Sequence, residues 1–183
     1  MQRVLILHGL GGSDYPHWQA ILAGDLIKQN YTVSFPAFPK RDNPQLEEWK
    51  EFLKKEIEHF KPDTVICHSL ANVLWFQTCE ELDINLEKLM LVAPVSRNRV
   101  VEAAQTFYPY TPPKNLKAKE IIMLASTNDP YMTEDEAMQL KEDLNVEIIV
   151  MKDAGHINAD SGFGSHDFAL DWLTKEKNDK GYI

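Results

Sequence analysis

The sequence carries short apolar runs separated by longer segments of mixed character. Six such runs are bounded by polar or turn residues: Val4–Leu7, Tyr31–Phe35, Thr64–Cys67, Leu89–Ala93, Ile121–Ala125 and Val146–Met151. They are apolar at successive positions instead of alternate ones, which is typical of strands that are buried on both faces. The pattern therefore predicts parallel strands that helices cover on both sides.

The segments between these runs have the period of amphipathic helices. Two of them gather apolar residues on one face: Trp18, Ile21, Leu22 and Leu26 in the first, and Leu46, Trp49, Phe52, Leu53, Ile57 and Phe60 in the second. Residues 70–82, 134–143 and 166–177 also have helical character. This alternation predicts an α/β fold, a three-layer sandwich around a mostly parallel sheet of about six strands. A ligand site is expected outside the carboxyl ends of those strands.

The chain length and the one segment that interrupts the strand and helix alternation predict how the chain is organised into domains. At 183 residues, the chain is expected to form one domain over residues 1–177, with a charged, frayed tail at 178–183. The segment Ser96–Ala118 breaks the alternation, and its prolines at 109, 112 and 113 exclude one regular helix. We expect a partly helical excursion there, close to the ligand site.

The net charge and the hydropathy of the chain argue against nucleic acid and membranes as binding partners. The 28 acidic residues outnumber the 19 basic ones and give a formal net charge of −9, so the chain should repel nucleic acid and anionic membrane surfaces. No apolar run approaches the roughly 20 residues that span a bilayer, and the N-terminus lacks a small-residue cleavage site. We expect a cytoplasmic protein, and the sequence leaves its oligomeric state open.

The cysteines and histidines do not form a recognisable metal or redox motif. Cys67 and Cys79 are too few for a disulfide framework and are not spaced as CxxC, so reduced thiols are expected. The six histidines lack HExxH spacing. We therefore expect neither a metal nor another cofactor.

The strand at 64–67 leads directly into Ser69 and a helix. This strand, turn and helix context presents a serine hydroxyl above the edge of a sheet. The usual GxSxG pattern of such a turn has glycines where this chain has Cys67 and Ala71, although both are small. A serine that only caps the helix is the alternative. The motif taken alone does not decide between the two.

An acid follows the fifth predicted strand and a histidine follows the sixth, in the order that a serine hydrolase of this fold requires. Asp129 lies in a turn that Pro130 stiffens, and His156 lies in a loop where Gly155 permits a tight turn. Because the carboxyl ends of parallel strands share one edge of a sheet, both side chains can converge on Ser69. We expect Ser69 to be the nucleophile, His156 the general base and Asp129 the residue that orients the base.

The first strand leads into a glycine-rich loop at residues 8–13. Its flexibility would allow backbone N–H groups to face a developing oxyanion. We expect the N–H groups of Leu10 and Leu70 to form the oxyanion hole. Dinucleotide binding is the poorer alternative, because GxGxxG would need glycine at Asp14, whose carboxylate would repel a pyrophosphate.

The sequence resembles the α/β-hydrolase superfamily, and within it the small serine hydrolases related to retinoblastoma-binding protein 9. The resemblance covers nearly the whole chain and rests on these segments: the loop 8–12 followed by Trp18, the His68-Ser69 element, the turn 126–130, and the GHIN segment at 155–158 with residues 161–164 behind it. It implies a compact hydrolase with a roughly six-stranded sheet and minimal or no lid. It also places Ser69, Asp129 and His156 on the family's triad positions.

The expected reaction is hydrolysis of carboxylic esters with small or medium acyl groups through an acyl-enzyme. Aromatic residues on neighbouring segments are candidates for substrate contacts: Trp18, Tyr108 and Tyr131. The alternatives are an amidase or peptidase with the same triad, and a catalytically weak protein that acts in binding. Cys67 as the nucleophile is a more remote alternative, because the predicted strand end buries it.

Overall fold

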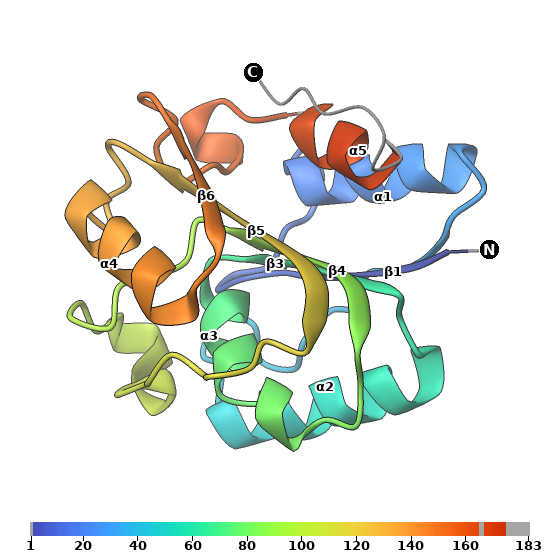
Figure 1. Cartoon of the computed structure of the whole chain (residues 1–183), viewed down its shortest axis with the longest axis horizontal. Helices are drawn as coiled ribbons and strands as arrows, with labels where there is room; N and C mark the ends of the chain where they lie inside the picture. Colours follow the sequence, from blue (N-terminus) through green and yellow to red (C-terminus); the bar gives the residue numbers. More distant parts are fainter. Residues whose placement is uncertain (1, 165–166, 175–183) are drawn as a thin grey trace.

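The computed structural model describes residues 2–164 and 167–174. Its centre is a six-stranded, wholly parallel sheet with the order β2-β1-β3-β4-β5-β6 (Figure 1). The strands are β1 Arg3–Leu7, β2 Thr32–Ser34, β3 Thr64–His68, β4 Leu86–Val92, β5 Ala118–Ser126 and β6 Glu147–Met151. Each coincides with one of the six predicted apolar runs, extended or shortened by a few residues.

Helices cover both faces of the sheet. Helices α1 Trp18–Lys28 and α5 Asp167–Thr174 lie on one face, and α2 Leu46–Phe60, α3 Leu70–Phe76 and α4 Glu134–Leu144 lie on the other (Figure 1). The predicted three-layer α/β sandwich is therefore confirmed. The ends of the predicted helix at 166–177, His166 among them, and the predicted tail at 178–183 lie outside the described residues.

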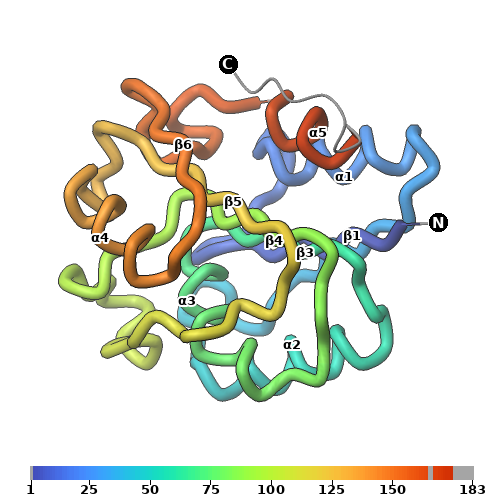
Figure 2. Tube along the Cα trace, viewed as in Figure 1, coloured from blue at the N-terminus to red at the C-terminus, as the bar shows by residue number. Residues whose placement is uncertain are grey.

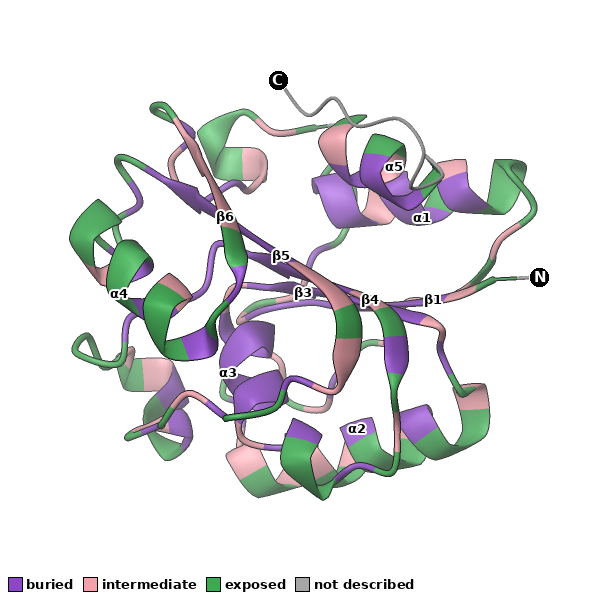
Figure 3. Cartoon of the chain, in the orientation of Figure 1, coloured by how far each residue is buried: buried purple, intermediate pink, exposed green. Residues whose placement is uncertain are grey.

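Successive residues of the strands enter two different cores because side chains alternate across a sheet. In β1, Val4 and Ile6 pack with α1 and α5, whereas Leu5 and Leu7 pack with α2 and α3. Figure 3 shows the consequence: the central strands are buried, while the outer sides of the helices are exposed. Burial on both faces explains why the strand runs are continuously apolar.

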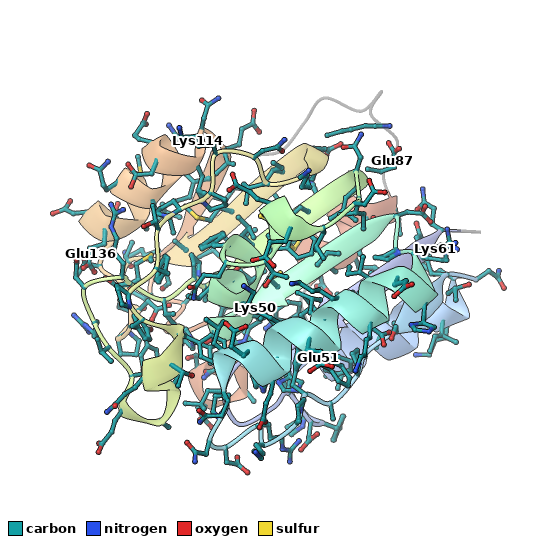
Figure 4. All side chains as sticks on the ribbon, turned by 90° about the horizontal axis from the view of Figure 1, so that it is seen from below. Lys50, Glu51, Lys61, Glu87, Lys114 and Glu136 are labelled. Carbon is teal, nitrogen blue, oxygen red and sulfur yellow. The ribbon has the colours of Figure 1, made fainter. Side chains whose placement is uncertain are left out.

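Helix α2 is the clearest amphipathic element. Trp49, Leu53 and Ile57 face the core, and Glu51 and the C-cap residue Lys61 lie on its exposed side (Figure 4). Lys61 has a left-handed backbone (φ 49°), which ends the helix. No helix among the described residues is long and apolar enough to cross a membrane.

Two segments depart from regular helix. The predicted helix over 70–82 divides into α3 and the short 3₁₀ helix η1 Cys79–Glu81. Between them, the Thr78 hydroxyl donates to the Leu74 carbonyl (2.7 Å). The predicted excursion after β4 contains only the 3₁₀ helix η2 Glu102–Phe107 and runs beside α4 (Figure 2).

Candidate active site

Ser69 lies on a sharp turn between β3 and α3. Its backbone is left-handed (φ 56°, ψ −124°), a conformation that costs about 1–3 kcal/mol for a residue with a side chain. The Ser69 N–H donates to the Val92 carbonyl at the end of the neighbouring strand (3.0 Å). Cys67 and Ala71, which stand where glycines were expected, are both fully buried and fit this turn.

The side chain of Asn72 stabilises this turn through hydrogen bonds. Its Nδ2 donates to the carbonyls of Ser69 (2.8 Å) and Val92 (2.9 Å), so one buried amide joins the turn to β4. The sequence analysis did not identify this residue. A signal was nonetheless present, since an asparagine three residues after the serine is an unusual choice for the apolar first turn of a buried helix.

The loops after β5 and β6 are joined by polar side chains of the turn 126–130. Ser126 Oγ accepts the Ala154 N–H (2.9 Å), and Asn128 Oδ1 accepts the Gly155 N–H (2.7 Å). Gly155 has φ 56°, and a Cβ there would lie 2.3 Å from Ser161 Oγ, so no other residue fits. These hydrogen bonds and this close contact fix the backbone that carries His156.

The predicted triad residues meet within hydrogen-bond distance. The Ser69 hydroxyl donates to His156 Nε2 (2.8 Å), and His156 Nδ1 donates to Asp129 (2.8 Å to Oδ2, 3.0 Å to Oδ1). Asp129 Oδ1 also accepts the Tyr131 N–H (2.8 Å). Only 3% of the Asp129 side chain is exposed, so its interaction with the imidazole is shielded from water.

Two further histidines pack beside this group. His68 Nε2 donates to the His156 carbonyl (3.1 Å) and so anchors the backbone of the loop that carries His156 to β3. The His17 ring lies 4.9 Å from that of His68, and its Nδ1 accepts the Gln19 N–H (3.2 Å). Burial lowers the pKa of His17 to about 4, which keeps its imidazole neutral at physiological pH.

The glycine-rich loop lies directly against Ser69. A Cβ on Gly9 would come within 2.7 Å of Ser69 Cβ, so only glycine permits this approach. His8 fixes the loop: its Nδ1 donates to the Gly9 carbonyl (2.7 Å), and its Nε2 accepts the Phe38 N–H (2.9 Å). Burial lowers the pKa of His8, and the neutral ring has the one donor and one acceptor that these contacts require.

A cavity of about 320 Å³ opens over the Ser69 hydroxyl. Its apolar and aromatic lining residues include Leu10, Leu70, Val95, Val101, Ala104 and Tyr131. Its polar lining residues include His17, His68, His156, Asn158 and Asp160. Leu10, Leu70 and Tyr131 were expected at the site, and the structure brings all three to this cavity.

Trp18 and Tyr108, which were also expected to contact substrate, lie elsewhere. Trp18 has no exposed surface, because α1 buries its ring in the core shared with α5. Its Nε1 donates to the Ile157 carbonyl (2.7 Å), so it supports the loop behind His156. Tyr108 packs against the core on the other face of the sheet and does not line the cavity. The expectation for both residues is corrected accordingly.

The environment of Cys67 counts against a cysteine nucleophile. Its side chain is fully buried within β3, and burial raises the pKa of its thiol well above the ordinary value. Among the described residues, no group of three or more histidine, cysteine or acidic side chains is arranged to hold a metal ion.

The parallel sheet, the strained serine turn and the serine, acid and histidine loops at one sheet edge define an α/β-hydrolase-type protein. A family model described as "Serine hydrolase" matches residues 4–175, and the chain belongs to that family. It is accordingly a serine hydrolase. A search of the curated proteins finds no match.

Solved structures share the fold at low sequence identity. The ydeN gene product from B. subtilis has a TM-score of 0.83 and 22% identity, covering 95% of this chain and 97% of its own. A putative YdeN-like hydrolase from Pectobacterium atrosepticum has a TM-score of 0.77 and 24% identity, with coverages of 94% and 89%. The esterase domain of a Rhodothermus marinus protein has a TM-score of 0.67 and 11% identity, with coverages of 94% and 84%.

Proposed function

We propose that the chain hydrolyses carboxylic esters of small or medium acyl groups through a Ser69, His156 and Asp129 triad. His156 removes the hydroxyl proton as Ser69 Oγ attacks the ester carbonyl, and Asp129 stabilises the imidazolium that forms. The leaving alcohol takes the proton, and water then releases the acyl group from Ser69. The observation that carries the proposal is the pair of 2.8 Å hydrogen bonds that link these three side chains.

The N–H groups of Leu10 and Leu70 would bind the oxyanion. Leu70 is the first residue of α3, where the backbone N–H has no partner within the helix and the helix dipole favours negative charge. The His8 ring binds the Gly9 carbonyl, and in a trans peptide the next N–H points the opposite way. His8 therefore supports a fixed orientation of the Leu10 N–H.

Esters are favoured over amides because their alcohol leaves more readily. The cavity of about 320 Å³ is suited to a small or medium acyl group, and its apolar lining residues support burial of that group. The esterase domain among the structural neighbours supports the same reaction class. Comparing p-nitrophenyl acetate with short peptide anilides tests the choice, since faster amide turnover would favour a peptidase.

Labelling with a fluorophosphonate probe tests the nucleophile. Wild type should label, and Ser69→Ala should not, with turnover falling by up to about 10⁶-fold. Cys67→Ala is the matched control and should keep its labelling, because that thiol is buried. Folded wild-type protein that does not label would refute catalysis and favour a binding role. Labelling that persists in Ser69→Ala but disappears in Cys67→Ala would refute the assignment of Ser69.

A further inference from the structure

The cavity has one charged side chain among the described residues that line it. Asp160 lies in the 3₁₀ helix η3 Ala159–Ser161, is exposed, and forms no ion pair with the described residues. No lysine or arginine is among the described lining residues. Because the pKa of His17 is lowered to about 4, its neutral ring does not offset this negative charge.

The proposed chemistry places the leaving group next to His156, and Asp160 lies further along the same loop. His156 must return its proton to the leaving oxygen, so that oxygen lies next to His156 Nε2. The loop that carries His156 continues along the cavity wall through Asn158 and Asp160. Apolar lining residues such as Val95 and Val101 are then available to the acyl group.

An aromatic ring also borders this region. The Tyr131 ring lies 4.6 Å from the His156 ring, lines the cavity and is 39% exposed. Asp160 and Tyr131 both line the cavity, and a carboxylate and an aromatic ring are the groups that bind alkylammonium ions in proteins. A negatively charged leaving group would instead meet this carboxylate. The guanidinium of Arg41, which lies against the lining residue Gly12, is paired with Asp14 (2.8 Å).

We propose that the cavity selects esters whose alcohol portion carries a positive charge, with Asp160 as the counter-charge and Tyr131 as an aromatic contact. This inference rests on the proposed ester hydrolysis and specifies its substrate class. The charge acts on the leaving group, so it should change selectivity between alcohols and leave acyl preference unaltered.

Two esters of matched shape test the inference. They are 3-(trimethylammonio)phenyl acetate and 3-tert-butylphenyl acetate, which share the acyl group and differ in one charge. Their intrinsic reactivities differ, so the quantity to compare is the ratio of their kcat/KM values in wild type and in Asp160→Asn. The ratio should fall about fivefold in the variant, as expected for loss of a partly exposed ion pair. It should also decrease in wild type as ionic strength rises.

Asp83→Asn is the matched control. Asp83 is exposed and precedes β4, at the opposite end of the strands from the cavity, so the same change in net charge should leave the ratio unaltered. An equal ratio in Asp160→Asn and wild type would overturn this inference alone, as would an equal fall in Asp83→Asn. Absence of turnover of both esters by wild type would overturn the proposed function together with it.

Discussion

Replacing Asn72 should loosen the turn that presents Ser69. Asn72 is fully buried, and its Nδ2 donates to the carbonyls of Ser69 and Val92, at 2.8 and 2.9 Å. Asn72→Ala removes both bonds. Asn72→Asp keeps the shape but, when ionised, replaces the donor with an oxygen that faces two carbonyl oxygens.

The magnitude for Asn72→Ala follows from three contributions. Two lost hydrogen bonds cost about 1 kcal/mol each, since both carbonyls keep a backbone partner at 3.0 Å. A void of roughly 40 Å³ adds about 1 kcal/mol at about 24 cal/mol per Å³. Asn72 Oδ1 is buried without a partner among the described residues, so its removal offsets about 1 kcal/mol of this loss of stability. The free energy of unfolding should therefore fall by about 2 kcal/mol, and by more in Asn72→Asp.

Loss of the two Asn72 hydrogen bonds should also lower the reaction rate of Ser69. Ser69 is held at φ 56°, and relaxation of this strained backbone would displace its hydroxyl from His156. A displacement of about 1 Å costs on the order of 100-fold in rate. Fluorophosphonate labelling of Asn72→Ala should therefore slow by about that factor.

Urea unfolding and labelling kinetics measure the two effects on the same samples. Asn85→Ala is the control, because Asn85 is exposed and lies near the start of β4, far from the turn. Its stability and labelling should match wild type. An Asn72→Ala protein that loses stability yet labels at the wild-type rate would show that the bonds do not position Ser69. Unchanged stability would refute the energetic reasoning as well.

Three further predictions concern the surroundings of the turn. Gly9→Ala should slow labelling by at least about 100-fold, because its Cβ would lie 2.7 Å from Ser69 Cβ; Gly24→Ala, with open space around it, should label normally. The pKa of His17 is lowered from 6.5 to about 4 by burial, so the unfolded chain binds the extra proton first as pH falls. The neutral His17 therefore contributes roughly 3 kcal/mol to the free energy of unfolding above pH 6.5, and this contribution is lost as the pH falls towards 4. Urea unfolding at pH 7 and 4.5 should therefore show a smaller loss for His17→Asn, which keeps a helix-capping acceptor, and an equal loss would contradict the assignment. The buried Cys67 thiol should not react with Ellman's reagent until the protein unfolds, and rapid native-state reaction would show that β3 opens.

The sequence by itself predicted the elements and their order. The continuous apolar runs identified all six strands of the sheet, because strands covered on both faces cannot alternate in polarity. The positions of Ser69, Asp129 and His156 after β3, β5 and β6 predicted that these side chains would meet. In a parallel sheet, the carboxyl ends of the strands lie at one edge, and the three side chains are indeed within hydrogen-bond distance. Their catalytic role stays a prediction.

The tertiary structure decided which surface each side chain faces. The hydrophobic pattern does not show what an aromatic side chain near the site contacts. The sequence therefore could not separate Tyr131, which lines the cavity, from Trp18, which packs in the core with α5. Sequence also did not identify Asn72, because its two acceptors, Ser69 and Val92, lie on different segments. The hydrophobic pattern of the sequence predicts that a side chain is buried. Which residues that side chain contacts depends on packing between distant segments.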